Sequence, residues 1–217
     1  KREFDFLVIG SGVAGLTFAL KVADYGKVAI IVKSCIDNTN TSLAQGGVAA
    51  VFSETDNYEK HIEDTYIASD KFANKDVIRM VVSEAPDRIK DLINLGASFD
   101  RDETGGYDLA REGGHSEKRI LHHKDNTGYE IQQVLVKHVC NHPNISVFEK
   151  HFAVEILTQH HLGKVVKRTS TDTECYGAYV LNLDTNMVDA FLAKKTLIAT
   201  GGSGNVYQTT TNPVVAT

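Results

Sequence analysis

A glycine-rich turn between an apolar strand and a helical segment constrains the fold of this chain more than any other feature. Residues 4–9 (FDFLVI) run into Gly10-Ser11-Gly12-Val13-Ala14-Gly15, and apolar residues at helical spacing follow. In this Gly-X-Gly-X-X-Gly pattern the first glycine makes the tight turn, the second lets the backbone approach a pyrophosphate, and the third lets the helix pack on the strand. Helix N–H groups can then hold the phosphates. With a strand before it and a helix after it, the motif predicts a dinucleotide site rather than a simple chain reversal.

Composition narrows the possible classes of protein. The chain has 217 residues, of which 42% are hydrophobic and 24% charged, enough to bury the core of one large domain. Its net charge of −5 argues against a nucleic-acid partner. The three cysteines, Cys35, Cys140 and Cys175, have no metal-type spacing, which predicts free thiols and no metal site. Because no apolar run could span a bilayer and no signal sequence is evident, we expect a cytoplasmic protein without a membrane partner.

The first part of the chain is predicted to be a βαβ unit. Two apolar strands, 4–9 and 28–32, flank a helix that follows the glycine turn and stops at Tyr25-Gly26. The continuous apolar character of both strands suits a parallel sheet covered on both faces. A polar loop is expected over residues 34–42.

Two helices are predicted in the middle of the chain, over 57–73 and 76–95. The apolar positions that we expect to face the core in the second helix are Val77, Met80, Val81, Ile89, Leu92 and Ile93. Pro86 lies inside this pattern and predicts a kink or break. Residues 98–120 show no periodicity.

The last part of the chain alternates between helix and strand signals. Thr127 and Glu130 form a predicted capping box at the start of a third helix, and a strand over 145–148 follows. Turn signals then separate three short strands, 152–159, 176–183 and 187–192, which predicts a small antiparallel β-meander within 152–192. A buried strand over 196–199 ends at Thr200-Gly201-Gly202. The predicted fold class is α/β, with a parallel sheet and this meander as an insertion.

The residue after the second strand bears on which cofactor binds. An acidic residue there normally accepts hydrogen bonds from the adenosine ribose. This chain has Lys33 instead, and a lysine can only donate. Lys33 alone is compatible with a 2′-phosphate, as in an NADP enzyme, with a flavin site that holds its ribose otherwise, or with a solvated strand end.

Several longer motifs occur in order along the chain. They are Asn40-Thr41-Ser42-Leu43-Ala44-Gln45-Gly46-Gly47, Arg111-Glu112-Gly113-Gly114-His115-Ser116, Arg119-Ile120-Leu121-His122, Asp125-Asn126-Thr127-Gly128, Ala199-Thr200-Gly201-Gly202 and the segment 206–213. With these motifs the chain closely resembles the L-aspartate oxidase family, within the superfamily of succinate dehydrogenase and fumarate reductase flavoproteins. The resemblance extends from residue 6 to residue 213.

The resemblance implies a Rossmann-like FAD-binding domain of the glutathione-reductase type over residues 1–217. It further implies that FAD oxidises L-aspartate to iminoaspartate, the first step of NAD (pyridine nucleotide) biosynthesis, with oxygen or fumarate as the electron acceptor. The cofactor-binding residues that it implies are Gly10, Ser11, Gly12, Val13, Ala14, Gly15, Lys33, Asn40, Thr41, Ser42, Leu43, Ala44, Gln45, Gly46, Gly47, Thr200 and Gly201. Lys33 is a feature of the family, which weakens the NADP interpretation.

Asn40 indicates how the flavin is held. Flavoproteins of the succinate dehydrogenase type carry at this position a histidine that attaches FAD covalently. An amide side chain cannot make that bond, so the resemblance implies noncovalent FAD.

Glu112 is the candidate catalytic residue. Hydride transfer from an α-carbon to a flavin requires the substrate's amine and two carboxylates to be held still, and a carboxylate near the amine can orient it. The resemblance implies that Glu112 contacts the substrate and helps to tell an amino acid from a simple dicarboxylate. The alternative is that Glu112 merely pairs with Arg111 or Arg119 in a solvated loop.

Histidines near these motifs are secondary candidates. His115 is a possible donor or acceptor in the substrate site, although histidines in polar loops are often surface groups. His61, with Glu63 and Asp64, has a spacing that fits a metal site poorly, and we expect it on a helix surface.

In the resembled family a capping domain and a C-terminal helical domain follow the segment that matches residues 206–213. The capping domain supplies a proposed catalytic arginine. We therefore expect the chain to be a fragment that holds FAD weakly and turns over aspartate poorly. A quinolinate synthase is a possible partner. Competing interpretations are a fumarate reductase or succinate dehydrogenase-like flavoprotein, a noncatalytic nucleotide-binding or scaffold subunit, and an NADP-binding protein.

Overall fold

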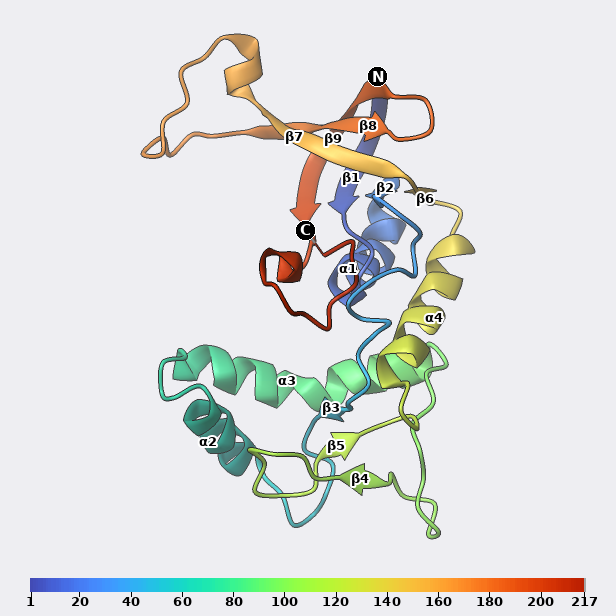
Figure 1. The fold of residues 1–217 in the computed structure, drawn as a ribbon, viewed down its shortest axis with the longest axis vertical. Helices are drawn as coiled ribbons and strands as arrows, with labels where there is room; N and C mark the ends of the chain where they lie inside the picture. The colour runs from blue at the N-terminus through green and yellow to red at the C-terminus, as the bar shows by residue number, and fades with distance from the viewer. Residues whose placement is uncertain (217) are drawn as a thin grey trace. The chain divides into compact units, whose positions relative to one another are not determined.

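A computed structural model describes residues 1–216 of the chain. Two compact units make up the structure: one combines Lys1–Thr41 with Leu135–Thr217, and the other is Ser42–Val134. Figure 1 shows the helices and strands of both units. No helix in the described residues is long and apolar enough to cross a membrane.

The first unit is built on a six-stranded mixed sheet (Figure 1). Its strands are β1 (Arg2–Ile9), β2 (Val28–Ile31), β6 (Ile145–Phe148), β7 (His151–Thr158), β8 (Cys175–Asn182) and β9 (Met187–Ile198), in the order β6-β2-β1-β9-β8-β7. Strand β1 runs parallel to both β2 and β9, and β2 runs parallel to β6. The predicted βαβ unit and parallel sheet are therefore confirmed.

The antiparallel meander is present, but it is continuous with the parallel sheet. Strands β7, β8 and β9 pair antiparallel, and β9 then continues as the parallel neighbour of β1. The sequence predicted two separate strands, 187–192 and 196–199, because Lys194 and Lys195 interrupt the apolar pattern. Both lysines are exposed, and Lys194 pairs with Asp5 at 2.7 Å. A strand with one face in solvent accommodates them without a turn.

The core of the first unit has two parts: helix α1 (Val13–Val22) packs on the sheet, and a separate apolar cluster is made of strand residues alone. Helix α1 buries Gly15, Leu16 and Ala19 and contacts β1 and β2. Phe191, at the point where β9 changes partner, is fully buried and stacks on Phe4 with ring centroids 6.0 Å apart.

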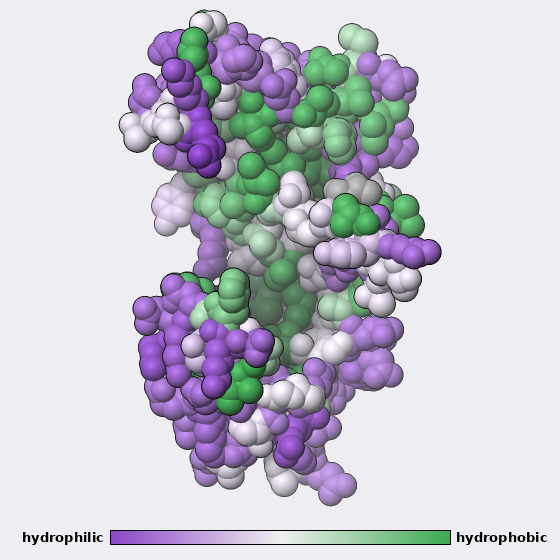
Figure 2. All heavy atoms as spheres, turned by 60° about the vertical axis from the view of Figure 1, so that its left-hand side comes forward, coloured by the Kyte–Doolittle hydropathy of each residue, from purple (hydrophilic) through white to green (hydrophobic). Residues whose placement is uncertain are grey.

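A mostly apolar cavity of about 580 Å³ lies on the sheet of the first unit. Its lining includes Phe4, Leu157, Leu162, Tyr179 and Leu192. Figure 2 shows hydrophobic residues gathered on the surface of this unit, at the top of the view.

The second unit contains two helices and a small sheet. Its elements are α2 (Tyr58–Ala68), α3 (Lys75–Asn94), β3 (Val48–Ala49), β4 (Leu109–Ala110) and β5 (Ile120–Leu121), and the antiparallel strands have the order β3-β5-β4. Strands of two residues leave no periodic signal, which is why the sequence showed no structure in 98–120. Helix α4 (Thr127–Cys140) begins in this unit and ends in the first. Short 3-10 helices cover Ala23–Tyr25, Gln159–Leu162 and Gly204–Val206.

The predicted apolar face of α3 is partly wrong. Val77, Met80 and Val81 are more than half exposed. The buried residues of the helix are Ile78, Val82, Pro86 and Ile89. Of the predicted kink or break at Pro86, a break is absent, because α3 continues through it. Burial of the proline ring within this apolar stripe offsets the one backbone hydrogen bond that proline cannot donate.

Two predicted helix ends also differ from the structure. Helix α2 ends at Ala68 rather than at residue 73, because Asp70 and Lys71 have positive φ angles of 52° and 60°, which no helix tolerates. Thr127 and Glu130, the predicted capping-box pair of α4, both bind groups outside the helix. Thr127 Oγ1 accepts from the N–H of His123 at 3.0 Å, and Glu130 instead accepts from the N–H of Ser98 at 2.9 Å.

The three cysteines are free and exposed, as the sequence predicted.

Candidate functional site

The glycine turn joins β1 to α1 at the carboxyl ends of the parallel strands. Gly10 has a φ of +112°, and a Cβ there would collide with the backbone oxygen of Ala199. Its N–H donates to the carbonyl of Ile31 at 3.0 Å. A Cβ on Gly15 would collide with the Gly10 carbonyl. Glycine at positions 10 and 15 is therefore required by protein packing alone, as the motif predicted.

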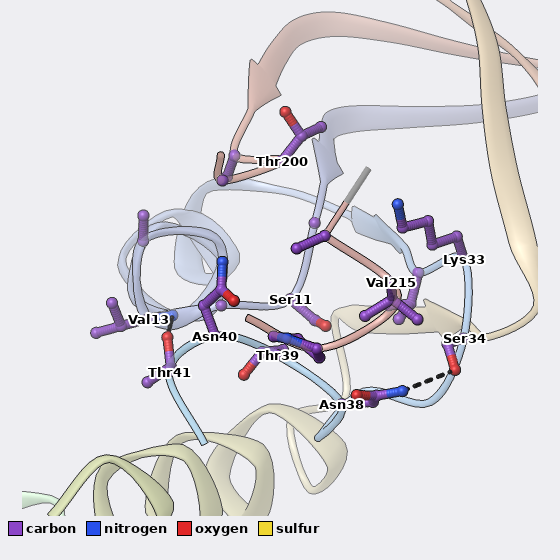
Figure 3. A pocket seen from close by; sticks show the side chains of 18 residues that line it. Ser11, Val13, Lys33, Ser34, Asn38, Thr39, Asn40, Thr41, Thr200 and Val215 are labelled. Atoms are coloured by element: carbon purple, nitrogen blue, oxygen red, sulfur yellow. Dashed lines mark hydrogen bonds between the residues drawn. The ribbon is translucent and has the colours of Figure 1, made fainter. Parts of the chain in front are cut away.

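Gly12 differs from these two glycines. Its φ of −71° suits any residue, and the nearest atom to an added Cβ would be Thr41 Oγ1, at 3.4 Å. Gly12 is the N-cap of α1, which has neither a capping side chain nor an acidic residue in its first turn. The N–H of Val13 donates to Thr41 Oγ1 at 3.1 Å (Figure 3). Thr41 thus satisfies one N–H of the first turn, and because no acidic residue lies in that turn, the positive end of α1 still favours an anion.

A cleft of about 260 Å³ lies at this helix end. It is lined by Gly10, Ser11, Gly12, Val13, Ala14, Val32, Lys33, Ser34, Asn38, Thr39, Asn40, Thr41, Ala199, Thr200, Gly201, Pro213, Val215 and Ala216. Figure 3 shows Ser11, Thr39 and Asn40 near the turn, with Lys33 above Ser34 at the right of the view. Lys33 is the one charged side chain among the described lining residues. With the helix dipole, it gives the cleft a positive potential.

A second cavity of about 250 Å³ shares Gly10, Lys33 and Thr200 with this cleft. It adds His151, Phe152 and Ala153 from the start of β7. Sequence reasoning missed these three residues, as well as Val32, Ser34, Asn38 and Thr39 in the cleft. The rule that ligands bind beyond the carboxyl ends of parallel strands could have pointed to them, because β6 ends just before His151.

Most of the predicted cofactor-binding residues come together at the cleft. Those that line it are Gly10, Ser11, Gly12, Val13, Ala14, Lys33, Asn40, Thr41, Thr200 and Gly201. Gly15 does not line it and acts instead in helix packing. The remaining predicted residues, 42–47 and Glu112, belong to the second unit.

Within the second unit, the segment 42–47 lies against the Glu112 loop. A Cβ on Gly46 would be 3.3 Å from Glu112 Oε1, and one on Gly47 would collide with Ile120. Ala44 accepts a hydrogen bond from the N–H of Gly128 at 2.9 Å. The two adjacent glycines therefore leave room for the Glu112 carboxylate on one side and for strand β5 on the other.

Glu112 is exposed and forms no ion pair within the described part of the chain. The alternative in which it pairs with Arg119 is wrong, because Arg119 is fully buried and binds Asp56 and Asp64 instead. The Glu112 carboxylate is therefore available to a ligand.

His61 is not a helix-surface residue, in contrast to the prediction. It is 6% exposed, and its Nδ1 has no hydrogen-bond partner among residues 1–216. Burial lowers the pKa of the imidazole, and the charge of Arg119 lowers it further. His61 faces His115, with ring centroids 5.7 Å apart. The residues that the structure describes contain no cluster able to hold a metal ion.

A protein-family model described as "FAD binding domain" matches residues 5–217. The chain belongs to the FAD binding domain family. Its cofactor is accordingly FAD, and the cleft fits this assignment through the bare backbone at Gly12, the positive end of α1 and Lys33. The predicted dinucleotide cofactor, FAD, is therefore confirmed, and NADP is disfavoured.

Curated relatives of this FAD binding domain include L-aspartate oxidases. The L-aspartate oxidase 2-a of Nicotiana tabacum, named chloroplastic, is 48% identical over 216 residues, covering 100% of this chain and 32% of that protein. The L-aspartate oxidase of Vibrio cholerae is 41% identical over 221 residues, covering 100% of this chain and 40% of its own length. The chain thus spans 32% to 40% of the length of these relatives.

Solved structures share the fold of this FAD binding domain. A quinol fumarate reductase of E. coli matches with a TM-score of 0.88 and 28% identity, covering 99% of this chain and 35% of that one. The Sdh1 complex of Mycobacterium smegmatis matches with a TM-score of 0.84 and 28% identity, covering 99% and 37% of the two chains. The predicted α/β fold of the fumarate reductase flavoproteins is therefore confirmed.

Proposed function

We propose that the protein containing this FAD binding domain oxidises L-aspartate to iminoaspartate, with oxygen or fumarate as the acceptor, in the first step of NAD biosynthesis. One observation carries the proposal: the unpaired Glu112 carboxylate lies beside Gly46 in the segment that we predicted to contact the flavin. The identity to curated L-aspartate oxidases over the whole chain supports it. Because the chain covers less than half of those relatives, the activity is proposed for the longer protein.

The residues of the cleft are proposed to hold the cofactor as follows. Ser11, Gly12, Val13 and Ala14 contact the pyrophosphate, as the positive end of α1 favours. Lys33 and Thr200 border both cavities and contact the adenosine portion. Asn40 leaves FAD noncovalent, because its amide is not a nucleophile.

The remaining proposed contacts are those of residues 42–47 and Gly201 with the cofactor.

Bound FAD supplies a hydride acceptor. The chain's own contribution is orientation: the Glu112 carboxylate accepts hydrogen bonds from the substrate's ammonium group and fixes its α-carbon. A dicarboxylate without an amine gains nothing from Glu112. This residue therefore favours aspartate over succinate or fumarate.

The partner, the cellular location and the domain organisation of the protein are also proposed. Iminoaspartate is reactive, and we propose a quinolinate synthase as the partner that consumes it. The proposed location is the cytoplasm, whereas the curated plant relatives are named chloroplastic. We also propose that residues 1–217 act as one FAD-binding domain in which 152–192 form the meander.

Anaerobic mixing of the full-length flavoprotein with aspartate tests this function. We expect aspartate to bleach the flavin absorbance and succinate to leave it unchanged. Glu112→Gln should raise the KM for aspartate about tenfold, the loss of roughly one charge-assisted hydrogen bond. The matched control is Glu103→Gln, a carboxylate at an exposed turn of the same unit, which should leave the KM unchanged. Bleaching by succinate alone would identify a succinate dehydrogenase-like enzyme, and bleaching by neither would favour a noncatalytic subunit.

A further inference from the structure

A buried arginine connects helix α2 to the loop that carries Glu112. Nε and Nη2 of Arg119 donate to the two carboxylate oxygens of Asp56, both at 2.8 Å, and Nη1 donates to Asp64 Oδ2 at 2.6 Å. The side chains of Arg119 and Asp56 are fully buried, and that of Asp64 is 16% exposed. A buried charge is tolerated only when its partners satisfy it. All three guanidinium nitrogens are accordingly engaged.

The backbone of Arg119 is held as firmly as its side chain. Its N–H donates to the carbonyl of Ala110 at 3.2 Å, and its own carbonyl accepts from the N–H of Ala50 at 3.0 Å. Arg119 immediately precedes β5, the central strand of the small sheet. The guanidinium therefore has a fixed position relative to this sheet.

The same charge network extends into the Glu112 loop. Asp64 Oδ2 accepts both the N–H and the hydroxyl of Ser116, each at 2.8 Å. Arg119 Nη1 lies 3.3 Å from Nδ1 of His115. A guanidinium only donates, so Nδ1 must accept and the ring proton lies on Nε2. The N–H of His115 donates in turn to the carbonyl of Glu112 at 3.3 Å, which links the network to that residue.

His61 supports the network from α2. It lies three residues before Asp64, and so on the same side of the helix, and its ring faces that of His115. Burial and the nearby guanidinium lower the pKa of His61. A neutral ring packed there supports His115 without adding a second positive charge beside Arg119.

We propose that Arg119 is a positioning residue: acting through Asp64 and His115, it fixes the loop 112–116 and thereby sets where the Glu112 carboxylate lies against Gly46. This inference rests on the proposed function, in which Glu112 orients the substrate's ammonium group. The network is then a determinant of specificity, because only a substrate with an amine depends on where Glu112 lies.

Ser116→Ala in the full-length flavoprotein tests the inference, because it removes one loop donor to Asp64 and leaves the Arg119 ion pairs in place. Thr104→Ala is the matched control, since the N–H and hydroxyl of Thr104 also donate to one carboxylate oxygen, that of Asp102, at 2.8 and 2.6 Å. We expect Ser116→Ala to raise the KM for aspartate about fivefold and to leave the KM for fumarate, measured with a reduced dye, within about twofold. Thr104→Ala should change neither KM, and Ser116→Thr, which keeps the hydroxyl, should restore the aspartate KM.

A double variant distinguishes an effect through Glu112 from a general loss of structure. If the loop acts through Glu112, adding Ser116→Ala to Glu112→Gln should not raise the aspartate KM further. Additive effects, or an equal rise in the KM for aspartate and for fumarate, would overturn the inference. An unchanged aspartate KM in Glu112→Gln alone would instead overturn the proposed function, and this inference with it.

Discussion

Gly10 and Gly12 belong to one turn, yet different physical causes require a glycine at each. Gly10 combines a positive φ with direct contact to the backbone at Ala199. Gly12 has an ordinary backbone conformation, and a Cβ there would make only an ordinary contact with Thr41 Oγ1, at 3.4 Å. The first position is thus constrained by the protein itself, whereas at the second the protein leaves a Cβ tolerable, and our proposed binding mode assigns the constraint to a ligand that approaches the backbone.

Alanine at each position should separate these two causes. Gly10→Ala should lower the free energy of unfolding by more than about 2 kcal/mol, because it combines backbone strain with a collision. Gly12→Ala should change the stability of the apoprotein by less than about 1 kcal/mol but raise the dissociation constant for FAD at least about tenfold. Urea unfolding and flavin fluorescence titration measure the two quantities. Unimpaired FAD binding in Gly12→Ala would contradict the assignment of the pyrophosphate to this turn.

His61 gives the stability of the chain a specific pH dependence. Its folded-state pKa lies below the ordinary 6.5 because the ring is buried beside Arg119 and His115, and Asp56 and Asp64 only partly oppose this. Between the two pKa values the unfolded chain therefore binds more protons than the folded chain. The free energy of unfolding should fall as the pH drops below 6.5 toward the folded-state pKa.

Replacing His61 should remove this dependence. His61→Gln is neutral at every pH, so its free energy of unfolding should fall less between about pH 7.5 and pH 5 than that of the parent chain. Asp64, whose pKa is lowered from 3.8, loses its stabilising contribution only below that range. His160→Gln, at an exposed position, is the control and should behave like the parent. If the free energy of unfolding fell equally with pH in His61→Gln and in the parent, His61 would not be the cause of the pH dependence.

At the scale of elements, α3 shows what periodicity can and cannot predict. The sequence correctly predicted a helix over this segment, but apolar residues occupy two adjacent stripes of it. Val77, Met80 and Val81 form one stripe, and Ile78 and Val82 form the other. Only the neighbouring helix decides which stripe is buried, and Ile78 and Val82 pack with Ile62 of α2. The spacing of apolar residues within α3 does not indicate which helix packs against it.

Two valines next to each other in α3 provide a direct test. Val82 is 3% exposed and Val81 is 57% exposed. Val82→Ala should cost about 2 kcal/mol in the free energy of unfolding, through lost burial and a residual cavity. Val81→Ala should change it by less than about 0.5 kcal/mol. Urea unfolding of both variants measures the difference, and equal costs would mean that the assigned face is wrong.

For the whole molecule, local sequence patterns predicted individual elements but not the contacts between elements that are distant in sequence. The glycine turn, the parallel strands and the meander each have a signature within a few residues, and all three are present. The pairing of β1 with β9 and the small sheet β3-β5-β4 depend on residues far apart in sequence. The same is true of Arg119, which the sequence offered as a possible partner of Glu112 but which binds Asp56 and Asp64 instead. Longer motifs indicated the Glu112 loop only through a family resemblance.

The pairing of β1 with β9 also affects how the chain is made. During translation β1 is synthesised early and β9 late. Strand β1 therefore cannot pair with β9 until the intervening residues have been synthesised. The cleft needs Gly10 from the early part and Ala199 to Gly201 from the late part. Flavin loading must therefore follow translation of this whole segment, and nascent chains stalled before β9 should be unable to capture the cofactor.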